Sequence, residues 1–367
     1  MAVLVAKIGS SSLVDQQGRL RDEVLEERVA ELVRVRRQGH HPVLVTSGAI
    51  ACGLGRLGIA DRPTALPDLQ AASAVGQGVL FRRYLEAFAP HGVLPAQVLL
   101  TSADLEGRAS YVNARNTLTR LLDLGVVPVV NENDTTATDE LTFGDNDVLA
   151  AHVAILLRAT WLVLLTDRDG LYGRGPDGRP ELIGDVPAGV APEQIELADM
   201  APSATGRGGI ASKIASASMA TAAGVTCVIA SGTRPGIITA IAHGRHVGTR
   251  FAPARTQRSA FKLWLLYAKP SMGRVRVDAG AARALRRRGT SLLPVGVVGC
   301  EGAFVAGDAV EVAGPDGRPL GKGITTLSAE ELRRVAGLKS AEVRQVLPDA
   351  EEEVIHRDRF VLLPAEL

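Results

Sequence analysis

Short, almost continuous runs of valine, leucine and isoleucine recur through the first 250 residues, with longer segments between them. The runs are Val3–Ala6, Val43–Thr46, Val93–Val98, Val126–Val130, Leu162–Thr166 and Thr226–Ala230. A strand that is buried on both faces has such a continuous run, whereas a strand with one face in water alternates apolar and polar residues. The pattern therefore predicts a parallel sheet that is covered on both faces.

The segments between these runs carry apolar residues at helical spacing. The stripes are Leu25, Val29, Leu32 and Val33, closed by Gly39; Leu69, Ala72, Val75 and Val79; and Leu149, Val153, Leu156 and Leu157. This alternation predicts an α/β fold, an open and mostly parallel sheet sandwiched by helices. In such a sheet, ligands bind at loops that follow the carboxyl ends of strands. Small or polar residues follow several expected strands, at 46–48, 131–134 and 166–167.

The pattern changes after about residue 255. Short strands are expected at Val275–Val277, Val295–Val298, Ala309–Val312, Gly323–Thr326 and Phe360–Leu363, with two short helices. We therefore expect a first domain at 1–255, a linker at 256–272, a small β-rich domain at 273–350 and a C-terminal extension at 351–367. The hexapeptide Gly-Pro-Asp-Gly-Arg-Pro occurs at 175–180 and at 314–319. Its residues are typical of turns, so it predicts two hairpin tips rather than a domain repeat.

The composition is that of an ordinary folded protein. Of its 367 residues, 46% are hydrophobic and 22% are charged, and the formal net charge is +1. A near-neutral chain is not suited to coating nucleic acid or a membrane. The first apolar run is too short for a signal peptide, and polar residues interrupt the apolar stretch at 148–165. We therefore expect a cytoplasmic protein without a membrane span, whose three scattered cysteines form no disulfide or metal pattern.

Lysine is rare in this chain. Six of the 41 lysine and arginine residues are lysines, and only Lys7 and Lys213 occur in the first 261 residues. Each lies in a glycine- and serine-rich stretch, the kind of segment whose backbone amides bind phosphate. A lysine ammonium is a compact point charge, whereas arginine offers a rigid fork. The pattern indicates two phosphate-binding lysines, and an arginine-rich codon bias with two ordinary surface lysines is the alternative.

Two polar segments, 130–134 and 143–147, lie close together in the sequence. They contain Asp134 and Asn146, side chains that can bind an ammonium group or organise a cation at strand ends and helix starts. The spacing alone is equally compatible with a Mg²⁺ site. For Asp139 and Glu140, which lie between the segments, a solvated loop is the better interpretation.

The string Gly-Leu-Gly-Arg-Leu-Gly at 53–58 has the glycine pattern of a dinucleotide-binding turn. That fingerprint requires a strand, a turn and a helix directly in series. Here other residues separate the string from the preceding strand, and Pro63 and Pro67 follow where a long helix should run. We therefore do not expect dinucleotide binding. The sequence also has no P-loop and no protein-kinase signature, so a phosphotransferase would belong to neither class.

Six motifs occur in a fixed order along the chain. They are Lys-Ile-Gly-Ser at 7–10, Val-Thr-Ser-Gly-Ala-Ile at 45–50, Val-Asn-Glu-Asn-Asp at 130–134, Gly-Asp-Asn-Asp at 144–147, Leu-Thr-Asp at 165–167 and Gly-Gly-Ile-Ala-Ser-Lys at 208–213. Together they closely resemble the amino-acid kinase family, over roughly residues 1–255. The second and third motifs separate the branch that phosphorylates glutamate from relatives acting on carbamate, aspartate or nucleotides. The region 273–350 resembles the PUA domain that many of these enzymes carry.

The resemblance implies an activity and its partners. It implies transfer of the ATP γ-phosphoryl group to the side-chain carboxylate of L-glutamate, giving γ-glutamyl phosphate and ADP as the first step of proline biosynthesis. Mg²⁺ would be held mainly by the nucleotide phosphates, so no metal ligand is expected from the protein. The resemblance also implies feedback inhibition by proline at an overlapping site, and a homo-oligomer that is a dimer or a tetramer.

Site residues follow from the same resemblance, position by position. ATP would be bound by Lys7, Thr166, Asp167, Arg207, Gly208, Gly209, Ile210, Ala211, Ser212 and Lys213. L-Glutamate would be bound by Ser47, Asp134 and Asn146. The catalytic residues would be Lys7, Lys213 and Asp147, with Asp147 orienting the two lysines. Arg207 departs from the family pattern, in which a threonine or another small residue is common, and this departure bears only on the local ATP contact.

Two other functions are alternatives to this one. The first is a related kinase that acts on another carboxylate. The second is RNA binding, because PUA-like folds often accompany RNA-modifying enzymes. Residues 273–367 contain 14 lysines and arginines and 14 acidic residues, and Arg286-Arg287-Arg288 is their one basic cluster. A net charge of zero makes RNA binding the weaker alternative.

Overall fold

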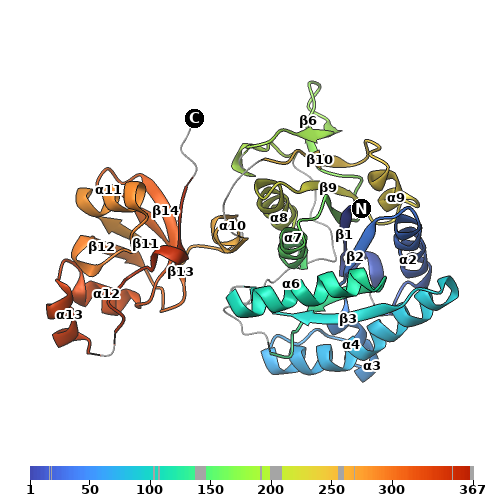
Figure 1. Cartoon of the computed structure of the whole chain (residues 1–367), viewed down its shortest axis with the longest axis horizontal. Coiled ribbons are helices and arrows are strands. Elements are labelled where there is room, and N and C mark those ends of the chain that lie inside the picture. The colour runs from blue at the N-terminus through green and yellow to red at the C-terminus, as the bar shows by residue number, and fades with distance from the viewer. Residues whose placement is uncertain are drawn as a thin grey trace. The chain divides into compact units, whose positions relative to one another are not determined.

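The chain divides into two compact units, Met1–Ala260 and Phe261–Leu367. The structure is a computed structural model (Figure 1) that describes residues 1–363 apart from 16, 18, 102–103, 106–107, 137–145, 191, 199–208, 255–259, 268 and 349. Each unit has a hydrophobic core of its own. The division lies within the segment that was predicted to be a linker.

In the described part of the first unit, eight strands form one sheet in the order β3-β4-β2-β1-β5-β9-β10-β8. Their bounds are β1 (Val3–Ile8), β2 (His41–Val45), β3 (Pro95–Leu100), β4 (Val127–Glu132), β5 (Trp161–Thr166), β8 (Asp185–Val186), β9 (Thr226–Ser231) and β10 (Thr249–Phe251). The strands from β3 to β9 in this order are parallel, and β10 is antiparallel to β9. All six expected strands are present, with ends shifted by at most two residues. The predicted open, mostly parallel sheet is confirmed.

Helices cover both faces of this sheet. They are α1 (Ser10–Leu13), α2 (Asp22–Arg37), α3 (Ala49–Leu57), α4 (Leu66–Phe88), α6 (Arg108–Asp123), α7 (Asn146–Leu156), α8 (Ile210–Ala222) and α9 (Ile237–Ala242), with single 3-10 turns at Ala89–His91 and Pro192–Gln194. In Figure 1, α2 and α9 lie on one face and α7 and α8 on the other. Successive side chains of a strand point to opposite faces, so Leu4, Ala6 and Ile8 enter the core beside α2. Lys7 consequently points to the face of α7 and α8.

The apolar stripe expected for α4 is wrong in part. Val75 is 39% exposed, whereas Ser73 and Gly76 are buried. The reason is the close approach of α3. A Cβ atom on Gly76 would lie 1.8 Å from the carbonyl oxygen of Ala49, and one on Gly53 would lie 1.7 Å from that of Ala72. Gly53 of the dinucleotide-like string therefore serves the packing of α3 against α4.

Two hairpins have their tips at the repeated hexapeptide, as predicted. In the first unit, β6 (Tyr172–Arg174) and β7 (Pro180–Leu182) pair around residues 175–179. In the second unit, β13 (Ala309–Ala313) and β14 (Pro319–Ile324) pair around residues 314–318.

In the described part of the second unit, five strands form a sheet in the order β12-β11-β13-β14-β15. The other elements are β11 (Gly273–Val277), β12 (Val297–Gly302), β15 (Phe360–Leu362), α10 (Ala260–Tyr267), α11 (Ala279–Arg288), α12 (Ala329–Val335) and α13 (Ser340–Val346), with 3-10 turns at Pro294–Gly296 and Arg357–Arg359. The β-rich character is confirmed. The sequence pattern indicated two short helices after residue 273, whereas three are described, because Gly337 with φ +81° separates α12 from α13. Helix α10 occupies the predicted linker, and β15 extends the sheet into the segment 351–367.

Candidate active site

Two lysine ammonium groups meet one buried carboxylate at the carboxyl edge of the first sheet. The Nζ of Lys7 lies 2.7 Å from Oδ1 of Asp147, and the Nζ of Lys213 lies 2.9 Å from Oδ2. The side chain of Asp147 is fully buried, and those of Lys7 and Lys213 are 4% and 9% exposed. The three groups together carry a charge of +1. Because charges interact strongly where water is excluded, this arrangement favours a bound anion.

Three elements bring these side chains together. Lys7 is near the end of β1, Asp147 is in the first turn of α7, and Lys213 is in the first turns of α8. The N-terminus of a helix carries partial positive charge, which stabilises the carboxylate of Asp147. The structure thus places Asp147 between the two lysines that it was expected to orient, and the catalytic roles of all three stay predictions.

Asn146 joins the ends of two neighbouring strands. Its Nδ2 lies 2.5 Å from the carbonyl oxygen of Thr46, 2.9 Å from Oγ of Ser47 and 2.7 Å from Oδ1 of Asn131. An amide nitrogen has two hydrogens, so these three acceptors share them. The arrangement brings together Ser47 and Asn146, two of the three residues expected to bind the amino-acid substrate. Asn146 also directly precedes Asp147 in the sequence of α7.

A glycine turn holds Ser47 in this position. Gly48 precedes α3 and has φ +103°, a conformation that favours glycine. A Cβ atom there would also lie 2.9 Å from Cγ2 of Val14. The chain therefore reverses tightly between β2 and α3, which leaves Ser47 at the edge of the sheet.

Asp134, the third expected substrate residue, lies in the turn after β4 and is held from α4. The buried hydroxyl of Ser73 donates a hydrogen bond of 2.6 Å to its Oδ2. Burial raises the pKa of Asp134, while the hydrogen bond from Ser73 and the charge of Arg62 lower it. The structure shows Asp134 in the same region of the sheet edge as Asn131, and gives it no hydrogen bond with Ser47 or Asn146.

The expected nucleotide residues lie at the ends of β5 and α8. Thr166 ends β5 and donates a hydrogen bond of 3.0 Å to Oδ1 of the exposed Asp167. Gly209 precedes α8, and the start of this helix (Gly209, Ile210 and Ala211) is exposed, with Ser212 partly buried. Arg207 and Gly208 lie outside the described residues, as do Asp139, Glu140, Gly144 and Asp145.

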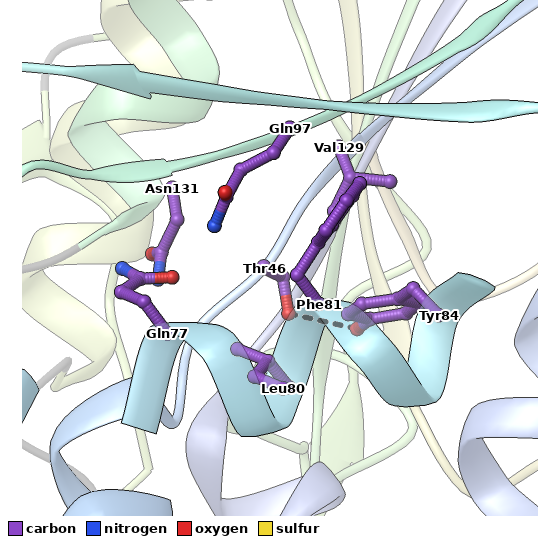
Figure 2. A pocket seen from close by; sticks show the side chains of 8 residues that line it. All are labelled: Thr46, Gln77, Leu80, Phe81, Tyr84, Gln97, Val129 and Asn131. Atoms are coloured by element: carbon purple, nitrogen blue, oxygen red, sulfur yellow. Dashed lines mark hydrogen bonds between the residues drawn. The ribbon is translucent and has the colours of Figure 1, made fainter. Parts of the chain in front are cut away.

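Three neighbouring residues were missed as site residues. Asn131 and Thr46 accept hydrogen bonds from Asn146, and the backbone N–H of Gly232 donates one of 2.6 Å to the carbonyl oxygen of Thr166. Gly232 directly follows β9. Ligands bind after the carboxyl ends of parallel strands, and applying this rule to every strand would have included Gly232. Asn131 and Thr46 also line a narrow pocket between α4 and strands β2, β3 and β4 (Figure 2).

The described residues contain no group of three or more histidine, cysteine, aspartate or glutamate side chains that could hold a metal ion. The buried histidine of α7, His152, is also unsuited to acid–base chemistry. Burial lowers the pKa of His152 to about 3, so its ring is neutral at physiological pH. No helix in the described part of the chain is long and apolar enough to cross a bilayer.

The division into two units agrees with a comparison to known families. Residues 2–231 match the amino acid kinase family, and residues 273–347 match the PUA domain. The chain belongs to the amino acid kinase family. A glutamate 5-kinase of Synechococcus sp. (strain JA-3-3Ab) is 48% identical to this amino acid kinase over 98% of both chains.

Other relatives extend this similarity. A glutamate 5-kinase of Moorella thermoacetica (strain ATCC 39073 / JCM 9320) is 43% identical to this amino acid kinase, over 98% of this chain and 96% of the relative. One of Thioalkalivibrio sulfidiphilus (strain HL-EbGR7) is 45% identical over the same shares. Among solved structures, the product complex of the isopentenyl phosphate kinase of T. acidophilum is 20% identical and covers 68% of this chain and 99% of that one, with a TM-score of 0.48.

Proposed function

We propose that this chain transfers the γ-phosphoryl group of ATP to the γ-carboxylate of L-glutamate, giving γ-glutamyl phosphate and ADP. The observation that carries the proposal is the buried pair of lysines on Asp147, directly beside Asn146 and its contact with Ser47. The lysines that would bind phosphate and the residues that would bind the amino acid thus lie at one edge of the sheet. The relatives named glutamate 5-kinase, similar over nearly the whole chain, support this choice of substrate.

The reaction requires no general base. A glutamate carboxylate has a pKa of about 4.3 and is ionised at neutral pH. Its oxygen forms a bond to the γ-phosphorus while the bond from that phosphorus to the β,γ-bridging oxygen breaks, and ADP leaves with the electron pair. No proton is transferred in this step. A neutral, buried His152 is therefore no obstacle to the proposed chemistry.

The difficulty of the reaction is electrostatic, because an anion must approach a polyanion. Lys7 and Lys213 would bind the phosphate oxygens and stabilise the charge that spreads over the transferred group. Asp147 would hold the two ammonium groups at a fixed separation. By analogy with the loss of one oxyanion donor, removing one lysine would cost about 3–4 kcal/mol of transition-state stabilisation.

The substrate amino acid would be held by Ser47, Asp134 and Asn146. The carboxylate of Asp134 is suited to the α-ammonium group, since the charges are opposite and the site is partly buried. The hydroxyl of Ser47 and the amide of Asn146 offer neutral hydrogen bonds. Together, these three residues would orient the substrate so that its γ-carboxylate faces the lysines.

ATP would be bound by Lys7, Thr166, Asp167 and the stretch of sequence from Arg207 to Lys213. A Mg²⁺ ion would neutralise part of the phosphate charge. The nearest carboxylate to the lysines, Asp147, already contacts both of them, and the described residues form no cluster of metal ligands. This donor set fits an ion that is held mainly by the nucleotide phosphates, and we assign no protein ligand to it.

The remaining parts of the proposal rest on the family resemblance. The product would enter proline biosynthesis, and proline would inhibit by binding at a site that overlaps the glutamate site. The protein would act in the cytoplasm as a dimer or tetramer, and its second unit would serve regulation or assembly.

A measurement of ADP release tests the proposal. The full-length protein is assayed with ATP and Mg²⁺ in the presence of L-glutamate, L-aspartate or N-acetyl-L-glutamate. We expect turnover with L-glutamate and little with the other two. Turnover that is faster with L-aspartate or N-acetyl-L-glutamate would overturn the substrate assignment and identify a related kinase of another carboxylate. No turnover with any of them would overturn the proposed activity.

A further inference from the structure

Helix α4 presents a row of residues to the substrate side of the sheet edge. Ser73, Gln77, Leu80 and Tyr84 are spaced by four, three and four residues, which places them on one face of the helix. Ser73, Leu80 and Tyr84 are almost fully buried. A purely structural face would be apolar, yet three of these four side chains are polar.

Each of the three polar side chains contacts a different part of the substrate edge. Ser73 donates its hydrogen bond to Asp134 after β4. The Nε2 of Gln77 donates a hydrogen bond of 3.2 Å to the carbonyl oxygen of Glu132, at the end of β4. The hydroxyl of Tyr84 lies 2.7 Å from Oγ1 of Thr46, at the end of β2.

The contact of Tyr84 reaches the substrate residues through Thr46. The backbone carbonyl of Thr46 is one of the acceptors of Asn146, and Ser47 is the next residue in the chain. Figure 2 shows Gln77 and Tyr84 extending from α4, with the dashed bond from Tyr84 to Thr46 and with Gln77 beside Asn131. Both partners of this bond are buried, so it is not weakened by competition with water.

We propose that Ser73 and Tyr84 are positioning residues, through which α4 sets the affinity for the carboxylate substrate without touching it. Ser73 fixes the carboxylate of Asp134, and Tyr84 fixes the turn that carries Ser47 and accepts from Asn146. This inference rests on the proposed function, since it assigns these residues to the amino-acid subsite. It assigns α4 no influence on the lysines or on the residues that would bind ATP.

Three variants of the full-length protein test the proposal. Ser73→Ala removes one hydroxyl, Tyr84→Phe removes the other while keeping the ring, and Thr46→Val removes the hydroxyl that Tyr84 contacts but keeps the Thr46 carbonyl. Arg82→Ala is the matched control, because Arg82 lies on α4 with its side chain 80% exposed. The measured quantities are kcat and the KM values for L-glutamate and for ATP.

We expect the KM for L-glutamate to rise about fivefold in Ser73→Ala and about threefold in Tyr84→Phe, in line with the loss of one hydrogen bond. The KM for ATP and kcat should stay within about twofold of wild type, as should every value in Arg82→Ala. Because Tyr84→Phe and Thr46→Val remove the same bond, the double variant should resemble either single variant. If Ser73→Ala fails to fold, the double-mutant cycle of Tyr84→Phe and Thr46→Val tests the proposal without it.

A pH profile gives a second readout that a purely structural role would not change. The hydrogen bond from Ser73 favours the charged form of Asp134, so its removal should raise the pKa of Asp134 further. The KM for L-glutamate, which is expected to rise on acidification, should then begin to rise at a higher pH than in wild type. The other charged groups in this region, Arg62 before α4 and Glu132 on β4, are unchanged in the variant. Tyr84→Phe should leave the profile of wild type unchanged.

Several results would overturn the proposal. One is an unchanged KM for L-glutamate in Ser73→Ala and Tyr84→Phe while wild type turns over glutamate. Another is a parallel rise of both KM values, which would assign α4 a general structural role. If the wild-type protein itself shows no glutamate-dependent ADP release, the proposed function fails first, and the inference fails with it.

Discussion

Lys213 places its ammonium group 2.9 Å from Oδ2 of Asp147, a carboxylate that is fully buried. The pair joins α8 to α7, and the other oxygen of the carboxylate contacts Lys7 of β1. A buried ion pair contributes little net stability, because both charges lose their hydration. Its value here would lie in holding two cations at a fixed separation, which is what transfer between two anions requires.

Replacing either lysine by arginine tests the need for point charges. In Lys7→Arg and Lys213→Arg the charge is kept, but a wider planar group must fit beside Asp147. We expect kcat to fall about 100-fold, as for the loss of one oxyanion donor. Circular dichroism and thermal unfolding serve as controls and should change little. Activity within about threefold of wild type in either variant would contradict the two-lysine mechanism.

Removing the charge of Asp147 should affect stability as well as catalysis. In Asp147→Asn the two buried ammonium groups lose their shared carboxylate, and we expect the free energy of unfolding to fall by about 3–5 kcal/mol. ATP should restore part of the loss, because its phosphates supply negative charge at the same place. Urea unfolding with and without ATP measures both effects. An Asp147→Asn protein with wild-type stability and turnover would contradict the role of Asp147.

The substrate residues should act on one KM value only. In Asp134→Ala and Asn146→Ala we expect the KM for L-glutamate to rise at least tenfold, since each removes a polar contact to the substrate. The KM for ATP should be nearly unchanged. Inhibition by proline should weaken in the same variants if its site overlaps. An equal rise of the KM values for L-glutamate and ATP would instead indicate a Mg²⁺-related or structural role for these residues.

The strands were predictable from the sequence because their apolar runs are continuous, and the polar residues after them marked the edge at which Lys7, Lys213 and Asp147 meet. Lys7 and Lys213 were found because lysine is rare elsewhere. The contacts of α4 were not predictable. Gly76 is buried while Val75 is exposed, because the close approach of α3 requires a small residue there, and hydrophobic periodicity does not predict such packing. Asn131 was part of a motif, but only the fold shows its bond to Asn146.

The raised pKa of Asp134 predicts a pH dependence of substrate affinity. Burial lifts this pKa above the ordinary 3.8, so the carboxylate takes up a proton at a higher pH than most aspartates as the pH falls. Protonation removes the charge that would bind the substrate ammonium group, and the KM for L-glutamate should therefore rise on acidification. In the same window the folded state binds more protons than the unfolded state, so the contribution of Asp134 to stability falls as the pH rises.

Steady-state kinetics from neutral pH downward would measure this effect, and the titration of the substrate's own carboxylate at about 4.3 is the same for wild type and variants. The Asp134→Asn variant is the matched control. It should have a high KM for L-glutamate that changes only with the titration of the substrate's own carboxylate. A variant that keeps the wild-type pH profile would show that another group causes it.

Deletion of everything after residue 260 should leave a folded kinase that still turns over. The first unit ends at Ala260 and has its own core, and every candidate site residue lies within it. A unit of this size buries enough apolar surface to fold alone. We expect kcat and both KM values within about threefold of the full chain, with an altered response to proline, because the second unit would act on regulation or assembly. Circular dichroism establishes that the truncated protein is folded. A folded truncation without phosphoryl transfer would show that the second unit contributes to catalysis itself.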